Sequence, residues 1–214
     1  MPIDILYEDN HILALNKPSG LLTQPSPTTD NSLETQAKAF IKERDHKKGN
    51  VFLHAVHRLD SQASGIVLFA KSQKALSRLS SSIREQQFQK EYVAIVQGAT
   101  PPKLGIVITY LHHGDHRADV VSPSHPLAKR SELVIISCQE HSSCQWKLHI
   151  MLVTGRYHQI RAQLSDIGYP IIGDTKYGST LPFAENAIAL HHSQLSFPHP
   201  TLDKEVCVES EPPF

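Results

Sequence analysis

Residues 57–72, HRLDSQASGIVLFAKS, place an acid between a basic pair and a run of apolar residues. Asp60 follows His57 and Arg58, and Gly65 opens the apolar run 66–70. This run is too short and too uniformly apolar for an amphipathic helix, so we predict a strand that is covered on both faces. A carboxylate one short turn ahead of such a strand is costly to bury unless another group pairs with it. Asp60 therefore calls for a partner from elsewhere in the chain.

The sequence on either side of this stretch predicts further short strands. They are expected at 3–7, 12–16 and 89–97, in a hairpin over 132–153 that turns near 141–143, and near the end of the chain. Hairpins dominate, and strands do not alternate regularly with helices. We therefore predict an α+β fold, with a mixed, largely antiparallel sheet flanked by a few helices. No repeat or linker divides the chain, so residues 1–214 are expected to form a single catalytic domain.

Three segments have helical spacing of apolar residues. The first is expected over about 33–47, with a capping box of Asn31 and Glu34 at its start and Gly49 at its end. The second should begin after Ser72 and bury one face. The third should begin at about residue 155, with Gly168 past its end, and also bury one face. The residues expected to point inward are Leu76, Leu79 and Ile83 in the second helix, and Ile160, Leu164 and Ile167 in the third.

Composition excludes several classes of protein. With 40% hydrophobic and 20% charged residues among 214, the chain is expected to be globular rather than disordered. The longest apolar runs last only a few residues, so no membrane span is expected. The N-terminus lacks the features of a signal peptide, and the three cysteines show no pairing pattern. We therefore expect a cytoplasmic protein without disulfides.

The net charge is zero, but its distribution is uneven. Residues 1–34 carry one basic and five acidic residues, and residues 166–214 carry two basic and seven acidic ones. The middle segment, 35–165, carries 18 basic and 9 acidic residues, an excess of nine positive charges. Such asymmetry is typical either of a basic face that binds nucleic acid or of an ordinary solvated surface.

Four stretches set polar residues in a strict local context: Lys17 in NKPSG, Asp60 in HRLD, Tyr92 in QKEYVAIV and Arg161 in GRYHQIR. Each has an ordinary structural explanation when taken alone. An Asp before a strand is usually a turn residue, a strand Tyr is usually in the core, and a helical Arg usually faces solvent. Their combination is more informative than any one of them.

The ordered set of motifs resembles the RluA family of RNA pseudouridine synthases. The matching segments are ILYEDxxILxxNKPSG (5–20), HRLDxxxSG (57–65), KxY (90–92), GRxHQIRxxL (155–164) and GxPIxGDxxYG (168–178). A lone HRLD would be weak evidence, whereas five segments in the family's order cover nearly the whole chain. The resemblance implies an isomerase that converts uridine to pseudouridine in ribosomal RNA, transfer RNA or both. It also implies the pseudouridine synthase catalytic fold. The reaction that it implies needs no metal or cofactor.

The same resemblance implies roles for individual residues. Asp60 would be the nucleophile, and the sequence leaves open whether it attacks C6 of the base, attacks C1′ of the ribose or assists glycal formation. Arg161 would be the cation that pairs with Asp60 and keeps it ionised. Tyr92 would lie against the uracil and serve as a base for the C5 proton. Arg58 would stack in the space that the flipped base vacates.

Three further residues are expected at the RNA. His57 and Gln159 are candidates for hydrogen bonds to backbone or base, and Lys17 is either structural or faces a phosphate. One departure from the family pattern is Ala63, where a Thr is common and its hydroxyl could support the Asp60 loop. We expect activity to persist despite this change. We expect that no S4-like domain precedes the catalytic motifs and that the protein is a monomer.

Two other classes of protein compete with this interpretation. The histidines in HHGDH (112–116) and at 191–192 invite a zinc hydrolase, but no HExxH or paired CxxC motif occurs, so we expect no metal site and a polar turn at 112–116. The second alternative is a catalytically silent RNA-binding protein of the same fold. Such a protein could lose Asp60, Tyr92 or Arg161, and the presence of all three favours the enzyme.

Overall fold

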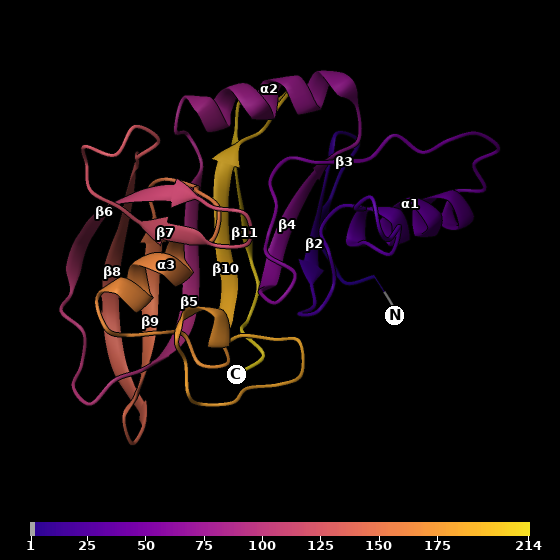
Figure 1. The fold of residues 1–214 in the computed structure, drawn as a ribbon. Helices are drawn as coiled ribbons and strands as arrows, with labels where there is room; N and C mark the ends of the chain where they lie inside the picture. Colours follow the sequence, from indigo (N-terminus) through magenta and orange to yellow (C-terminus); the bar gives the residue numbers. More distant parts are fainter. Residues whose placement is uncertain (1–2) are drawn as a thin grey trace. The chain divides into compact units, whose positions relative to one another are not determined.

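The computed structural model describes residues 3–214, and the contacts of the chain divide it into two units (Figure 1). Unit 1 contains residues 3–89 together with His192–Pro213, and unit 2 contains Lys90–His191 with Phe214. Each unit combines helices with antiparallel strand pairs. The chain therefore has the α+β fold that the sequence predicts.

The strands of unit 1 follow the order β1-β2-β4-β10; off this path, β11 pairs with β10 and the short β3 pairs with β4. Their bounds are Ile5–Glu8 for β1, Ile12–Lys17 for β2, His54–Ala55 for β3, Ser64–Ala70 for β4, Leu190–Pro198 for β10 and Glu205–Glu209 for β11. Every residue of β4 is buried, which confirms the predicted strand covered on both faces. Lys17 lies opposite Gly65 in the β2–β4 register, so the end of β2 lies beside the start of β4.

Two helices belong to unit 1: α1 (Leu33–Arg44) and α2 (Gln73–Arg84). Ser72 caps α2 as predicted, because its hydroxyl accepts a hydrogen bond from the backbone of Ala75 at 3.2 Å. The capping box predicted for α1 is wrong. Ser32 caps this helix, and the Glu34 carboxylate instead accepts hydrogen bonds from Gln24, Lys38 and the Ala55 amide.

The end predicted for α1 at Gly49 is also wrong, because the helix ends at Arg44. Asp45 is its C-cap, and His46 then takes the left-handed conformation (φ 50°) that stops a helix. Glycine is the usual residue in this conformation, but here a histidine adopts it. A search for the nearest glycine therefore places the end of the helix too late in the chain.

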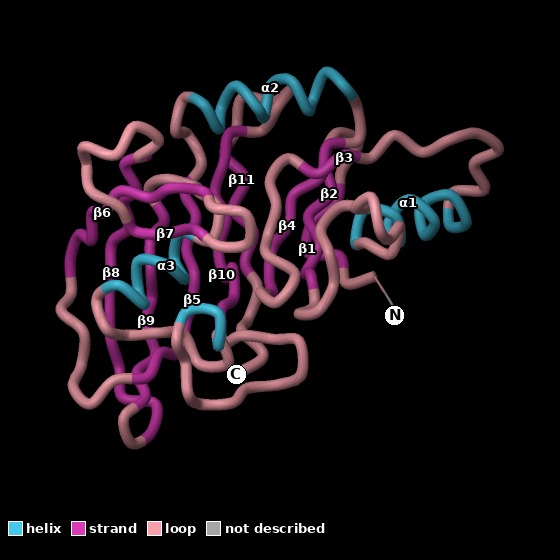
Figure 2. The backbone as a smooth tube through the Cα atoms, viewed as in Figure 1, coloured by secondary structure: helices cyan, strands magenta, loops and turns pink. Residues whose placement is uncertain are grey.

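The core of unit 1 lies under α2. Ala75 and Leu79 of this helix are fully buried, and Leu76 and Ile83 are partly buried against the same cluster. Figure 2 shows the helix in cyan across the magenta strands of this unit. The strand residues in this cluster are Ile12, Ala14, Ile66, Leu68, Ala70, Leu195, Phe197, Val206 and Val208. They come from both segments of unit 1, so residues 192–213 complete a core that begins at residue 12.

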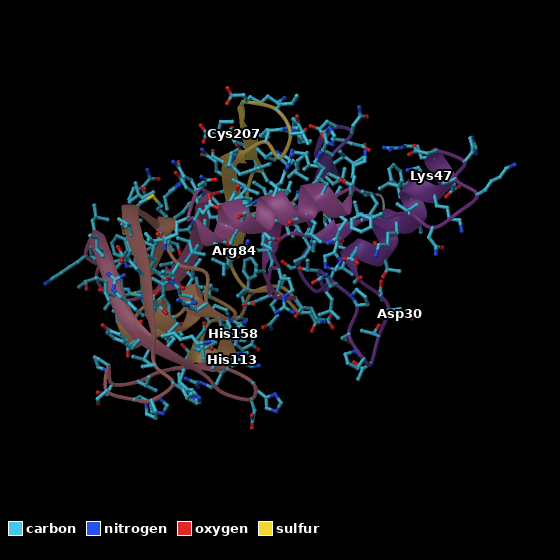
Figure 3. The ribbon with its side chains drawn as sticks, turned by 90° about the horizontal axis from the view of Figure 1, so that it is seen from above. Asp30, Lys47, Arg84, His113, His158 and Cys207 are labelled. Atoms are coloured by element: carbon cyan, nitrogen blue, oxygen red, sulfur yellow. The ribbon has the colours of Figure 1, made fainter. Side chains whose placement is uncertain are left out.

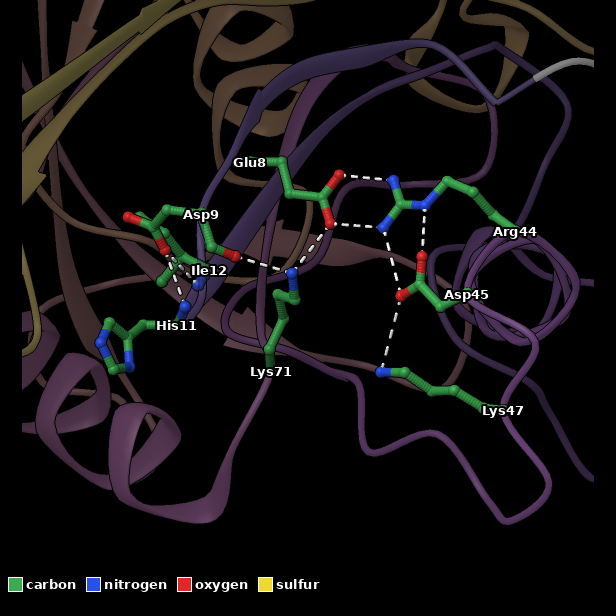
Figure 4. Close-up of polar contacts among 8 residues, drawn as sticks. All are labelled: Glu8, Asp9, His11, Ile12, Arg44, Asp45, Lys47 and Lys71. Carbon is green, nitrogen blue, oxygen red and sulfur yellow. Dashed lines mark hydrogen bonds and ion pairs between the residues drawn. The ribbon is translucent and has the colours of Figure 1, made fainter.

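Charged side chains join the end of α1 to β1 (Figure 4). The Glu8 carboxylate accepts two hydrogen bonds from Arg44, at 2.7 and 2.8 Å, and one from Lys71 at 2.8 Å. Asp45 pairs with Arg44 at 2.8 Å and with Lys47 at 3.7 Å. Part of the positive excess of residues 35–165 is thus paired with acidic side chains of the same unit.

Unit 2 follows the strand order β5-β9-β8-β6-β7. Its strands are β5 (Gln89–Gln97), β6 (Gly105–His113), β7 (Ala118–Val120), β8 (Lys129–Ser142) and β9 (Gln145–Leu152). The predicted hairpin is confirmed as β8–β9, and it turns at residues 143–144, where Cys144 has φ 58°. The segment 112–116 forms the end of β6 and the polar turn into β7.

One helix, α3 (Gln159–Asp166), and a 3₁₀ turn, η1 (Thr175–Tyr177), complete unit 2. Ile160 and Leu164 are buried as predicted, but Ile167 is 36% exposed, so that prediction is wrong. Ile167 is the C-cap, and the chain turns away from the helix axis there through Gly168. Along residues 3–214, none of the helices has the length and apolar character needed to cross a membrane.

Candidate active site

Asp60 lies, half-buried, in the loop that enters β4 of unit 1. The Ala63 amide donates a hydrogen bond to the Asp60 carbonyl at 3.1 Å, which closes a tight turn. The Thr23 hydroxyl accepts from the Leu59 amide at 3.1 Å and donates to the Leu59 carbonyl at 3.0 Å. The backbone on both sides of Asp60 is therefore held by hydrogen bonds, and the carboxylate starts from a defined position.

Lys17 supports the same loop from below. Its side chain is fully buried, and the ammonium donates to the carbonyl oxygens of Pro18, Leu21 and Ser61 at 2.9, 2.8 and 3.0 Å. Burial lowers the pKa of this amine to about 7, and the negative charge of Asp60 opposes that shift. Of the two alternatives for Lys17, the geometry favours the structural one, because a fully buried amine does not face a phosphate in solvent.

Ala63, where the family commonly has Thr, is almost completely buried. The loop is held without a hydroxyl at this position, by the Ala63 amide, by Lys17 and by the Gly20 amide, which donates to the Ser61 carbonyl at 2.7 Å. The turn around Asp60 therefore keeps several hydrogen bonds to its backbone although the Thr hydroxyl is missing.

Gly65 fixes the path of the chain after this turn. Its φ is 111°, and a Cβ at this position would lie 2.3 Å from the carbonyl oxygen of His192 in β10. Only glycine fits such a close approach.

The His57 ring lies edge-on to the His192 ring, with 5.4 Å between the ring centres. Nε2 of His57 accepts a hydrogen bond from the Leu68 amide at 3.2 Å. Arg58 is exposed beside it.

Arg161 forms a buried ion pair in unit 2 that the sequence did not predict. Its Nε lies 2.6 Å from Oδ2 of Asp174, and a terminal nitrogen lies 2.8 Å from Oδ1. The two side chains are 2% and 1% exposed. Such a two-point contact fixes the plane of the guanidinium. Asp174 belongs to the motif GDxxYG, which was the available signal, but the motif did not name its partner.

Tyr177 packs against the same guanidinium, whose carbon lies 5.1 Å from the centre of the Tyr177 ring. The Tyr177 hydroxyl accepts from the Ala118 amide at 2.8 Å and lies 3.0 Å from Nδ1 of His158. Burial raises the pKa of this phenol to about 12. Tyr177 is therefore a neutral, fixed wall beside Arg161.

The two other predicted residues of unit 2 are also buried. Tyr92 lies in β5, opposite Ile150 of β9, and is 6% exposed. The Gln159 side chain donates to the Glu132 carbonyl at 3.0 Å and accepts from Thr154 and from the Arg156 amide, at 2.8 and 3.0 Å. Gln159 thus holds the loop that precedes α3, and its expected contact with RNA stays a prediction.

The predicted site residues fall into two groups. Lys17, His57, Arg58 and Asp60 belong to unit 1, and Tyr92, Gln159 and Arg161 belong to unit 2. The expected pairing of Arg161 with Asp60 stays a prediction. Within residues 3–214, no three His, Cys, Asp or Glu side chains gather in a way that could hold a metal ion.

Comparison with known protein families supports the interpretation of these motifs. The family model described as RNA pseudouridylate synthase matches residues 11–166. The chain belongs to this family. Enzymes of the family isomerise uridine to pseudouridine in RNA, so this protein is an RNA-modifying isomerase, as the sequence predicts.

Curated relatives match most of the chain. It is 34% identical to an uncharacterized RNA pseudouridine synthase (MG209 homolog) of Mycoplasma pneumoniae, over 98% of this chain and 67% of the relative. It is 31% identical to the dual-specificity RNA pseudouridine synthase RluA of Vibrio vulnificus, over 92% of this chain and 78% of that relative. For the ribosomal large subunit pseudouridine synthase C of Buchnera aphidicola the identity is 31%, over 95% of this chain and 65% of the relative.

The fold also matches a solved structure. The human RNA pseudouridylate synthase domain containing 4 superposes with a TM-score of 0.78 at 21% identity, covering 98% of this chain and 88% of the human chain. At this identity the likeness concerns the fold alone.

Proposed function

We propose that this protein forms pseudouridine in ribosomal RNA, transfer RNA or both, with Asp60 as the nucleophile. The N1–C1′ bond of uridine breaks, the uracil turns, and a C5–C1′ bond forms. The C5 proton is lost and N1 gains a proton, so the atoms balance without a cofactor. The observation that carries the assignment is the Asp60 turn, because its backbone is held by Thr23 and Lys17 while the side chain stays half-buried.

Two residues of unit 2 complete the proposed mechanism. Arg161 would share its guanidinium between Asp174 and Asp60, and this second contact would keep the nucleophile ionised. Its support is the two-point contact with Asp174, which fixes the guanidinium before any substrate arrives. Tyr92 would take the C5 proton, directly or through water. Arg58, which is exposed, would fill the space that the uracil leaves in the RNA stack.

We further propose that the uridine is flipped out of its stack into the site, since a duplex hides the atoms that react. The two units would act together as one catalytic domain, as a monomer and in the cytoplasm. The described cysteines, Cys138, Cys144 and Cys207, are free thiols, which fits a reducing compartment. The name of the Buchnera aphidicola relative, a ribosomal large subunit enzyme, supports ribosomal RNA as a substrate, and light scattering tests the monomer.

The experiment is an exchange of Asp60 for Asn, which removes the nucleophile with little change in volume. Pseudouridine is mapped by carbodiimide treatment and primer extension in RNA from cells that carry the parent, the variant or no copy of the gene. We expect Asp60→Asn to give the pattern of cells without the gene, while the purified variant keeps its melting temperature and RNA affinity. Asp203→Asn, an exposed acid of unit 1, is the matched control and should behave like the parent. Activity of Asp60→Asn within about tenfold of the parent would overturn the assignment.

A further inference from the structure

The His-rich segment of β6 ends in a stack of three aromatic rings, His113, Tyr157 and His158, which we call the ring stack. The centres of the Tyr157 and His113 rings lie 4.2 Å apart with planes tilted by 32°. On Tyr157, the His158 ring lies 3.8 Å away and nearly parallel, at 19°. The His113 and His158 rings are both too close to Tyr157 to share one face of its ring, so the Tyr157 ring lies between them. Figure 3 shows His113 and His158 near each other.

The inner end of the ring stack is fixed. His158 is 9% exposed, and its Nδ1 lies 3.0 Å from the hydroxyl of Tyr177, the ring that packs against Arg161. His158 also has a left-handed backbone, with φ 50°, which is uncommon for a residue with a side chain and costs free energy. The fold therefore maintains a strained position at which His158 connects Tyr157 to the Arg161 cluster.

The outer end of the ring stack is open. Tyr157 is 37% exposed and His113 is exposed at the last position of β6. A planar ring presented to solvent and held from behind is the arrangement with which proteins stack unpaired nucleobases.

Exposed basic side chains come from the same loops as this end. Arg156 is exposed and precedes Tyr157, and Lys176 is exposed and donates to the His116 carbonyl at 3.0 Å. Arg117 donates to the Lys176 carbonyl at 3.3 Å, although its charge is partly met by Asp119 at 2.8 Å. Positive charges beside stacking rings match the chemistry of single-stranded RNA, which alternates phosphates and bases.

We propose that the outer face of His113, with Tyr157 packed behind it, forms a stacking platform for one unpaired base of the RNA substrate. The proposal rests on the proposed function in RNA. Tyr157 occupies the open position of the motif GRxHQIR, and His113 comes from a segment with no motif. The platform is thus a feature of this chain's own sequence. It gives the HHGDH segment a role in base stacking in place of metal binding.

The test compares two single-stranded probes of equal length by fluorescence anisotropy, an oligouridylate RNA and an abasic oligomer with the same phosphates. The parent should prefer the oligouridylate. Tyr157→Ala and His113→Ala should each weaken oligouridylate binding about tenfold while leaving the affinity for the abasic oligomer within twofold. Tyr157→Phe, which keeps the ring, should restore the preference.

His116→Ala is the matched control, because His116 is an exposed histidine of the same turn and its backbone carbonyl, which binds Lys176, is retained. Melting curves establish that each variant is folded. The proposal is overturned if both ring variants bind oligouridylate within twofold of the parent. It is equally overturned if they lose affinity for both probes alike, or if the parent does not distinguish the two probes.

These results are independent of catalysis, because the binding assay needs no turnover. If Asp60→Asn keeps its activity, the proposed nucleophile is wrong, yet the ratio of the two affinities still decides whether the platform binds a base. If the ratio does not change in the ring variants while Asp60→Asn is inactive, the platform is wrong and the nucleophile stands.

Discussion

The buried pair of Arg161 and Asp174 should be energetically coupled, and a double-mutant cycle can measure this coupling. The three variants are Arg161→Met, Asp174→Asn and the combination of both. Met keeps much of the aliphatic length of Arg without the charge, and Asn keeps the shape of Asp without the charge. Each single change leaves one charge or one set of buried hydrogen-bonding groups without its partner.

The size of the effect follows from burial and geometry. Both side chains are 98% or more buried, and two contacts of 2.6 and 2.8 Å join them. Breaking one side of a buried ion pair costs about 3–5 kcal/mol, because the remaining charge stays in a medium of low dielectric. The double variant removes both charges, so its loss should be smaller than the sum of the single losses by about 2 kcal/mol.

The assay is urea denaturation of the parent and the three variants at neutral pH, followed by far-ultraviolet circular dichroism. Arg117 and Asp119 provide a matched control cycle, because their ion pair is also short, at 2.8 Å, but the side chains are 50% and 47% exposed. An exposed pair should show a coupling below about 1 kcal/mol.

Additive losses for Arg161 and Asp174 would refute the reasoning, since they would mean that the two side chains do not depend on each other. A coupling no larger than that of Arg117 and Asp119 would show that burial adds nothing to this pair. Either result would also remove the support for a guanidinium fixed in advance of the substrate.

Three further predictions concern pH and salt. The Lys17 amine has a folded pKa of about 7, below its ordinary 10.5, so it binds fewer protons in the folded than in the unfolded state between these pH values. The free energy of unfolding of the parent relative to Lys17→Met, measured by urea denaturation, should therefore rise with pH across this window by at most about 1.4 kcal/mol per pH unit, and a flat difference would contradict the shift. Hydrogen bonds from Arg44 lower the pKa of Glu8 from 4.5 to about 2. The free energy of unfolding of the parent should therefore exceed that of Glu8→Gln by its full amount above pH 4.5, and this difference should disappear as the pH falls through 2. Affinity for single-stranded RNA should fall with salt, with a logarithmic slope of roughly −0.7 for each phosphate contacted, and an unchanged affinity between low and moderate salt would show that the basic excess makes no RNA contact.

Local sequence patterns predicted most of the fold. The strand at β4, the hairpin β8–β9 and the start of α2 at Ser72 all followed from apolar periodicity and turn residues. The errors lie where tertiary contacts decide a boundary. Glu34 was predicted to cap its own helix, but the Ala55 amide and Lys38 take its carboxylate.

The sequence names candidate site residues, whose roles stay predictions, but it does not show which contacts hold them. The motif HRLD identifies Asp60, yet nothing local shows that Lys17 reaches the Ser61 carbonyl, 44 positions along the chain. Arg161 was expected to pair with Asp60, and its pairing with Asp174 was missed because periodicity carries no information about which buried charges meet. Tyr157 gave no signal at all, since an exposed aromatic residue in a loop acquires its meaning only from the ring beside it.

The order of synthesis bears on unit 1, which is assembled from two separated segments. A ribosome that has completed residues 3–89 has made β1, β2 and α2, but Leu195, Phe197, Val206 and Val208 of the same core are still missing. The first segment must wait with an apolar surface uncovered while about a hundred residues of unit 2 emerge, and this interval favours association with chaperones or with other nascent chains. The last strands thus act as a check on completion, because a chain cut short before β10 would fail to close its first core and would be a ready target for proteolysis.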